Sequence, residues 1–172
     1  MERPLLFLDV DGPLIPFGTS PLRPTTSDAD YEALPDGENP LLSRLDPTVG
    51  PRLMALGCDL VWATTWMEEA NESVGPAIGL PRLPVLEWPE TPEPGPRGLH
   101  WKTRPIVERA EGRPFIWIDD EIGPVDHLWV AAQHDPPYLL HHVPASKGLT
   151  DTDFTTLTDW LHTTPHLGLY GR

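Results

Sequence analysis

The sequence contains few features that would cross-link the chain or hold it in a membrane. Cys58 is its only cysteine, so no disulfide forms within the chain and nothing indicates an oxidising compartment. The apolar run of residues 5–10 is interrupted by Asp9 and is too short for a signal peptide or a membrane span. We therefore expect a cytoplasmic protein without membrane contacts, in which Cys58 is chemically inert.

Basic side chains are scarce as well. Lysine and arginine together number 12 against 26 aspartates and glutamates, which gives a formal net charge of −14 at pH 7. Binding to a polynucleotide backbone needs basic surface, so we expect no extended nucleic-acid-binding surface. A phosphorylated nucleic-acid end is still compatible with this charge, because a divalent cation and one lysine can offset a single phosphate group.

Long uninterrupted helices are not expected, because 23 prolines punctuate the chain. The apolar fraction of 39% argues against disorder, and 172 residues predict one domain spanning 1–172. Two irregular stretches are expected at the surface of this domain. Residues 16–40 are interpreted as a flap or vestigial cap loop, and residues 76–98 as a Pro-rich loop with one short strand at 84–88.

Short apolar runs alternate with amphipathic segments along the rest of the chain. The apolar runs predict β-strands at residues 5–10, 59–63, 114–118 and 138–143. The other segments predict a helix within 39–56, interrupted by its prolines, and helices over 67–74, 100–110, 127–133 and 152–162. The alternation predicts an α/β fold: a three-layer, Rossmann-like domain with a central parallel sheet flanked by helices.

Polar side chains stand where the predicted strands end, and such positions meet at one edge of a parallel sheet. They are Asp9 and Asp11 after the first strand, Thr64 after the second, Asp119 and Asp120 after the third, and Lys102 on the helix between the last two. Clustered aspartates repel one another and are costly to bury unpaired. A hard divalent cation resolves this, and oxygen ligands that share the ion with a substrate phosphate are what Mg²⁺ prefers.

The segment Leu-Phe-Leu-Asp9-Val-Asp11-Gly12 resembles the first signature of the haloacid dehalogenase (HAD) superfamily. Three further signatures are matched in the same chain order: Thr64 behind Leu-Val-Trp-Ala, then Lys102, then Asp119-Asp120 behind Phe-Ile-Trp-Ile. The resemblance implies a Mg²⁺-dependent phosphohydrolase, a phosphomonoesterase. Asp9 would be the nucleophile that forms an aspartyl-phosphate, and Asp11 the general acid and base.

The resemblance also implies the binding roles. Gly12, Thr64 or Thr65, and Lys102 would bind the phosphoryl group, with Lys102 also restraining Asp9. Thr65 could instead cap the following helix, and Arg104 is the alternative to Lys102. The implied metal ligands are Asp9, Asp119, the backbone carbonyl of Asp11 and, directly or through water, Asp120.

The presence of Asp11 favours phosphoryl transfer over dehalogenation, since the dehalogenases of the family lack an acid there. The stretches before Thr64 and Lys102 predict a member with no large cap, whose substrate is a small metabolite, a nucleotide or a nucleic-acid end. Trp66 and Trp88 could stack on a substrate ring near the entrance. The histidines show no metal-ligand spacing, and the sequence predicts no oligomeric state.

Two alternative functions belong to other classes. A signalling receiver domain also gathers aspartates, a threonine and a lysine around Mg²⁺, but it places the acidic pair first and the lysine near its end, the reverse of the order found here. The second alternative is a non-catalytic accessory module that binds a phosphate or a nucleic-acid end.

Overall fold

A four-stranded, fully parallel β-sheet with strand order β2-β1-β3-β4 forms the centre of the computed structural model, which describes residues 2–18 and 39–164. The strands are β1 (Leu5–Leu8), β2 (Asp59–Trp62), β3 (Phe115–Asp119) and β4 (Tyr138–His142). The predicted α/β fold with a parallel sheet is confirmed. The first strand ends earlier than predicted, because the Val10 carbonyl accepts hydrogen bonds from the amides of Leu14 and Ile15 and closes a turn.

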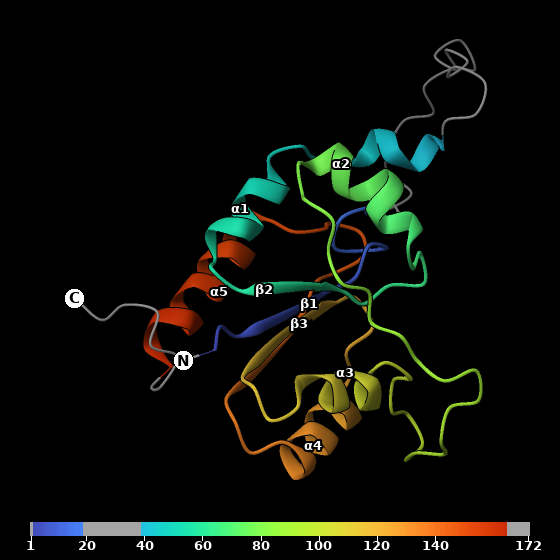
Figure 1. The fold of residues 1–172 in the computed structure, drawn as a ribbon, viewed down its shortest axis with the longest axis vertical. Helices are drawn as coiled ribbons and strands as arrows, with labels where there is room; N and C mark the ends of the chain where they lie inside the picture. The colour runs from blue at the N-terminus through green and yellow to red at the C-terminus, as the bar shows by residue number, and fades with distance from the viewer. Residues whose placement is uncertain (1, 19–38, 165–172) are drawn as a thin grey trace.

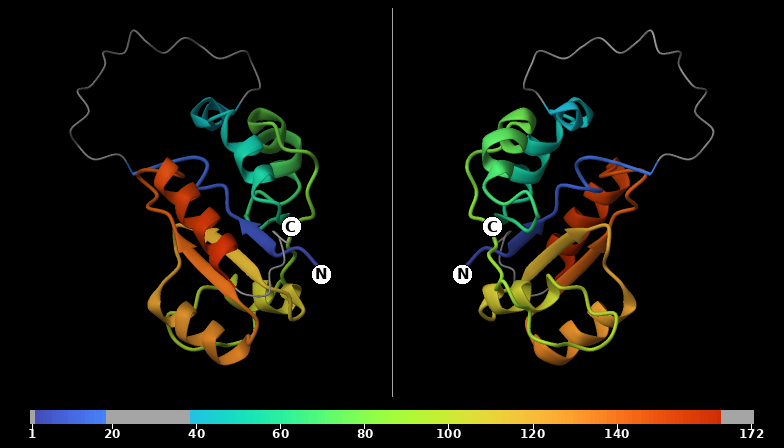
Figure 2. Two further views of the ribbon diagram at one scale, coloured as in Figure 1. Left: turned by 90° about the vertical axis from the view of Figure 1, so that its left-hand side faces the viewer. Right: turned by 90° about the vertical axis from the view of Figure 1, so that its right-hand side faces the viewer.

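Helices cover both faces of the sheet (Figure 1). They are α1 (Val49–Ala55), α2 (Gly75–Ile78), α3 (Thr103–Ala110), α4 (Pro124–Gln133) and α5 (Asp151–Thr163), together with the 3-10 helix η2 (Pro40–Arg44) and the π-helical turn η3 (Ala70–Val74). Figures 1 and 2 show α1, α2 and α5 on one side and α3 and α4 on the other. The arrangement is the predicted three-layer, Rossmann-like one.

Side-chain alternation along the strands explains the two layers. Even-numbered residues of β1, β2 and β3, such as Leu6 and Trp62, pack with Leu53 of α1 and Leu157 of α5. The odd-numbered residues contact the other layer: Leu5, Phe7, Val61, Phe115 and Trp117 pack with Ile106 of α3 and Val130 of α4. On α5, the predicted apolar side, Phe154, Leu157 and Leu161, is buried as expected.

The sheet has a topological switch point between β1 and β3. After β1 the chain next forms α1 on the first face, whereas after β3 it forms α4 on the opposite face. The loops that leave the two strands therefore diverge, and open α/β sheets bind ligands in the crevice this creates at the carboxyl ends of the strands.

Two predicted segments differ from the structure. The helix predicted over 67–74 is present in part as η3, but the loop predicted from Pro76 begins later, since η3 continues into α2, which ends at Gly79 with a φ of +80°. Pro76 has no amide proton to donate, and it lies at the junction where the π-helical turn passes into α2. The predicted strand at 84–88 is a single bridge between Val85 and Trp62, since the flanking prolines cannot extend the ladder.

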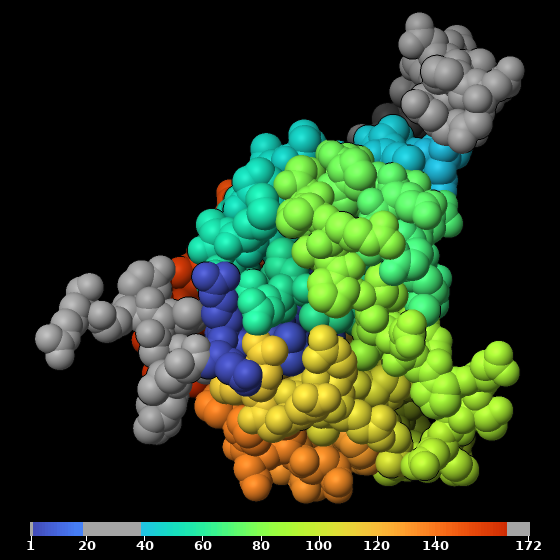
Figure 3. All heavy atoms as spheres, in the orientation of Figure 1, coloured from blue at the N-terminus to red at the C-terminus, as the bar shows by residue number. Residues whose placement is uncertain are grey.

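The other helices lie close to their predicted positions, with the first broken into η2 and α1 as its prolines predict. Most of the predicted flap at 16–40 lies outside the described residues, which include only 16–18 and 39–40 of it. Distal parts of the 76–98 loop stand out from the molecular body (Figure 3). No helix among the described residues is long and apolar enough to cross a membrane.

Candidate active site

Asp9, Lys102 and Asp119 form a buried ionic cluster at the switch point. The register pairs Leu8 with Ile118, so the residues that follow them, Asp9 and Asp119, stand level on neighbouring strands. Lys102 is the N-cap residue of α3, which packs on the same face. Its Nζ lies 3.1 Å from Asp9 Oδ2 and 2.8 Å from Asp119 Oδ2. The side chains are 3% exposed for Lys102, 8% for Asp9 and 0% for Asp119, so water screens this cluster little.

One ammonium group faces two carboxylates, so the cluster carries a net negative charge. Burial raises the pKa of Asp9 from 3.8 to about 7, with the attraction of Lys102 lowering it and the charge of Asp119 raising it. Asp119 is held from two further directions: Oδ1 accepts a hydrogen bond from the amide of Glu121, and Oδ2 accepts one from Trp117 Nε1. The protein thus fixes the cluster in place while leaving its charge unbalanced.

Asp120 extends the acidic group towards the loop after β1. Burial, together with the negative charge of Asp119, raises the pKa of Asp120 from 3.8 to about 6. Gly12 has a φ of +95°, and a Cβ at this position would lie 2.7 Å from Asp120 Cβ and Cγ. Only glycine fits there, because the loops after β1 and β3 touch at this point. Carboxylate oxygens of Asp9, Asp119 and Asp120 lie within 4.8 Å of one another, close enough to share one cation.

Asp11 is half-buried beside the cluster and is held by a tryptophan. Trp66 Nε1 donates a hydrogen bond of 3.1 Å to Asp11 Oδ2. The indole N–H of Trp66 thus orients Asp11, and whether its ring also stacks on a substrate stays a prediction.

The two threonines after β2 have different environments. Thr64 is fully buried, and its Oγ1 accepts a hydrogen bond of 3.2 Å from the amide of Trp66. That bond uses an acceptor site, so the hydroxyl proton can still be donated to a ligand oxygen. Thr65 is exposed. Of the two predicted phosphate contacts, Thr64 is therefore the one held rigidly at the edge of the sheet.

Sequence reasoning missed Asp126, a buried carboxylate in the first turn of α4. Its Oδ1 accepts hydrogen bonds from the amide of His100 at 2.8 Å and from Thr103 Oγ1 at 2.6 Å, and its Oδ2 accepts one from the amide of Gly123 at 2.8 Å. These bonds fasten the start of α3, and hence Lys102, to α4. An acid in the first turn of a helix follows a common capping pattern, so nothing in the sequence marked this position.

His100 was also missed. Its Nδ1 accepts a hydrogen bond from the amide of Lys102 at 3.1 Å, so the proton is on Nε2, which lies 3.0 Å from Glu121 Oε2. His100, Asp119 and Glu121 form a second group whose ligand atoms lie within 4.8 Å of one another. Because Nδ1 is committed to the backbone and Nε2 to Glu121, the ring helps to fix the Lys102 segment against the loop after β3.

The arrangement as a whole offers a cation site, a fixed ammonium group and two carboxylates on one loop. Such a group can neutralise a phosphate and attack it. No family model, curated protein or solved structure matches this chain. Any functional assignment therefore rests on the side chains at the carboxyl edge of the sheet.

Proposed function

We propose that the protein is a Mg²⁺-dependent phosphomonoesterase of the HAD type, in which the Asp9 carboxylate attacks phosphorus. The observation that carries the proposal is the contact of Lys102 with both Asp9 and Asp119 at the switch point of a parallel sheet. The four sequence signatures that resemble HAD proteins end at this edge, and three of them share the buried cluster. Arg113 also contacts two carboxylates, Asp59 and Glu2, but that group is partly solvated, whereas Lys102 and its two carboxylates are at most 8% exposed.

The donor set suits Mg²⁺. Asp9, Asp119 and Asp120 offer only carboxylate oxygens, the ligands that a hard divalent cation prefers. The raised pKa values of Asp9, about 7, and Asp120, about 6, reflect crowded buried carboxylates, and a cation among them would return both groups to their charged forms. When bound, the ion would supply positive charge opposite the phosphoryl oxygens.

In the first half-reaction, a carboxylate oxygen of Asp9 forms a bond to phosphorus while the bond from phosphorus to the leaving-group oxygen breaks. Asp11 lies two residues beyond Asp9 and is held by a hydrogen bond from Trp66. It donates a proton to the departing alkoxide. Lys102 and the Thr64 hydroxyl stabilise the negative charge on the phosphoryl oxygens. The product is an acyl phosphate on Asp9 and a free alcohol.

In the second half-reaction, water attacks the phosphorus of the acyl phosphate. Asp11, now a carboxylate, takes the proton of this water, and the bond between phosphorus and Asp9 breaks. Inorganic phosphate leaves and Asp9 returns to its carboxylate form next to Lys102. Protons and bonds balance over the cycle, with one water consumed for each phosphoester.

The experiment that tests the proposal is hydrolysis of p-nitrophenyl phosphate with and without Mg²⁺. We expect turnover by the wild type only with Mg²⁺, and a loss on the order of a thousandfold or more in Asp9→Asn, since that variant lacks the nucleophile. Asp11→Asn should lose about 10²–10⁴-fold in rate, mainly in the second half-reaction, because p-nitrophenolate leaves without a general acid whereas the attacking water still needs a base. Asp159→Asn, an exposed aspartate on α5, is the matched control and should be unaffected.

The outcomes separate the alternative functions. A receiver-like domain would accept one phosphoryl group and release no excess phosphate, so a single stoichiometric burst would contradict the proposal. A non-catalytic module would bind inorganic phosphate without turning over any ester. Equal rates for the wild type and Asp9→Asn would exclude Asp9 as the nucleophile.

A further inference from the structure

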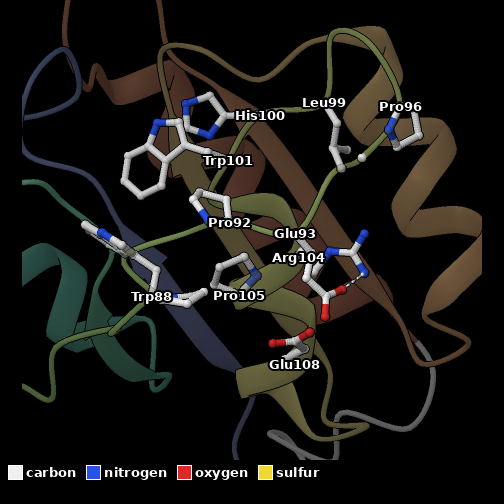
Figure 4. Close-up of a pocket in the computed structure, with 12 residues that line it drawn as sticks. Trp88, Pro92, Glu93, Pro96, Leu99, His100, Trp101, Arg104, Pro105 and Glu108 are labelled. Atoms are coloured by element: carbon white, nitrogen blue, oxygen red, sulfur yellow. Dashed lines mark ion pairs between the residues drawn. The ribbon is translucent and has the colours of Figure 1, made fainter.

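A cavity of about 280 Å³ lies beside the proposed active site, between the Pro-rich loop and α3. Its size is just under that of typical small-molecule sites, ~300–1,000 Å³, so it suits a single ring system and not a whole cofactor. Three aromatic rings stand on one side of it and charged side chains on the other (Figure 4). Its lining includes Trp88, His100, Trp101, Arg104, Glu93 and Glu108.

The aromatic side of the cavity has a fixed geometry. The rings of Trp88 and Trp101 meet edge to face, with centroids 4.4 Å apart and an interplanar angle of 76°. Trp101 also stacks on His100, with centroids 5.4 Å apart at an angle of 30°. Trp101 is held on both sides, yet 37% of it is exposed. Because the two indole planes are nearly perpendicular, a planar ligand that stacks on Trp88 would meet Trp101 edge to face.

Trp101 connects this cavity to the catalytic cluster. Lys102 Nζ, the atom that pairs with Asp9, also lies 5.4 Å from the centre of the Trp101 ring. A ligand whose phosphate lies at Lys102 can therefore reach Trp101 with its next ring. Asp9, Lys102 and Asp119 do not line the cavity, and Trp101, which does, is its contact with the catalytic cluster.

The polar side of the cavity indicates which ring fits. Arg104 Nη1 pairs with Glu93 Oε2 at 3.3 Å, and Glu108 lies exposed one turn further along α3 (Figure 4). Arginine donates to ring nitrogen and carbonyl acceptors such as those of guanine, and carboxylates accept from amino and imino groups. Arg104 already bonds to Glu93 and to the carbonyl of Pro94, and Glu108 is exposed. A nucleobase carries acceptors for the guanidinium and donors for the carboxylates, which a hydrocarbon ring lacks.

We propose that this cavity is a leaving-group subsite that binds the base of a nucleoside monophosphate. The proposal rests on the phosphohydrolase function proposed above, and it names the class of substrate. The phosphate would lie at Asp9 and Lys102, the ribose would pass Trp101, and the base would stack on Trp88 and meet Trp101 edge to face, with its polar edge towards Arg104. The high negative charge of the protein is compatible with this ligand, because only one phosphate has to be neutralised.

The test is calorimetric binding in the Asp9→Asn background, which is not expected to turn over, with Mg²⁺ present. Guanosine 5′-monophosphate should bind about tenfold or more tightly than ribose 5-phosphate, as expected for one stacked base. Adding Trp88→Ala should reduce this ratio by about tenfold, and Trp88→Phe, which keeps a ring, should restore most of it. Trp160→Phe, on α5, is the control and should leave the ratio unchanged.

Equal affinity for the two ligands, or a ratio unaffected by Trp88→Ala in a protein with native thermal unfolding, would overturn the subsite. Phenyl phosphate binding as tightly as the nucleotide would overturn the assignment to a nucleobase, because it lacks the polar edge that Arg104 reads. Arg104→Met provides a second variant, which should lower nucleotide affinity but not that of phenyl phosphate. Since binding is measured without turnover, failure of the subsite is distinct from failure of the phosphohydrolase function.

Discussion

The two ends of the same parallel sheet hold charge in different surroundings. At the amino end, Arg113 pairs with Asp59 at 2.6 Å, and the two side chains are 22% and 47% exposed. At the carboxyl end, Lys102 faces both Asp9 and Asp119, and none of the three is more than 8% exposed. Arg113 also lies 3.5 Å from Glu2 Oε2, so each end joins one basic side chain to two carboxylates. The amino end is partly solvated, whereas the carboxyl end is buried.

This difference shows which charges serve the fold. A partly solvated pair contributes little and costs little. Buried carboxylates without enough positive charge destabilise the protein unless a ligand compensates them, and such groups are concentrated at functional sites. Buried charge therefore lowers stability at the carboxyl end more than at the amino end. This predicts that the effects of substitutions on stability differ in size and sign between the two ends.

The largest difference in stability is expected when the basic side chain at each end is replaced by methionine. Lys102→Met leaves two buried carboxylates facing each other and should lower the free energy of unfolding by about 3–5 kcal/mol at neutral pH without metal. Arg113→Met should cost about 1 kcal/mol, because the pair it breaks is partly solvated. Urea unfolding of both variants makes the comparison. Equal losses would mean that the buried cluster is no more strongly coupled than the surface pair.

Asp9→Asn is expected to act in the opposite direction and to stabilise the metal-free protein by roughly 2 kcal/mol above neutral pH. Because burial raises the pKa of Asp9 from 3.8 to about 7, the folded state binds more protons than the unfolded state between these values. The stability of the wild type should therefore fall as pH rises from about 4 to about 7, and this slope should weaken in Asp9→Asn.

Thermal unfolding across this pH range, in a metal chelator, measures the effect. Asp59→Asn at the amino end is the matched substitution and should lower stability by less than about 1 kcal/mol through the loss of its Arg113 contact. A wild-type protein that becomes more stable between these pH values would show that Asp9 is charged and compensated without a metal.

Asp126→Asn should lower the free energy of unfolding by an intermediate amount, about 1–2 kcal/mol, because its amide nitrogen cannot accept a hydrogen bond. If the nitrogen replaces Oδ2, the bond from the Gly123 amide is lost; if it replaces Oδ1, the bonds from the His100 amide and Thr103 Oγ1 are lost. Since these bonds hold the Lys102 segment, the turnover of p-nitrophenyl phosphate should fall with them. Asp159→Asn serves again as the control for unfolding and turnover. If the variant is less stable but keeps full turnover at a temperature where it is folded, Asp126 does not position Lys102 for catalysis.

The smallest effect is expected at Cys58, a buried group at the amino end. Burial raises the pKa of its thiol to about 12, so the group is neutral in both folded and unfolded states over the range where Asp9 titrates. Cys58→Ala should therefore change stability by about 1 kcal/mol or less, equally at every pH between about 4 and 7. If the change in stability caused by Cys58→Ala depended on pH in this range, the pH dependence expected for Asp9 could not be assigned to the carboxyl end alone.

The core of the site was predictable because parallel strands impose it. Asp9 and Asp119 each follow an apolar run, so any parallel pairing of these runs brings the two carboxylates to one edge, and Lys102 begins the helix that crosses above them. Thr64 was favoured over Thr65 for the same reason, as the first polar residue beyond its strand. These positions depend on sequence order and strand direction alone.

The supporting side chains were not predictable in this way. His100 and Asp126 are joined by a hydrogen bond across 26 positions, and the contact depends on how α3 docks against α4. The continuation of η3 into α2 depends on the tertiary contacts of Asn71, whose Oδ1 accepts hydrogen bonds from Trp62 Nε1 and the amide of Leu83. Local pattern carries no information about such contacts.

The most direct test of the central claim is to trap the intermediate. An acyl phosphate is reduced by borohydride to an alcohol, which converts the aspartate that carries it to homoserine. During turnover of p-nitrophenyl phosphate with Mg²⁺, peptide mass spectrometry should find homoserine at position 9, and none when Mg²⁺ is withheld. Turnover that continues with an unmodified Asp9, or with homoserine at another aspartate, would contradict the assignment of Asp9 as the nucleophile.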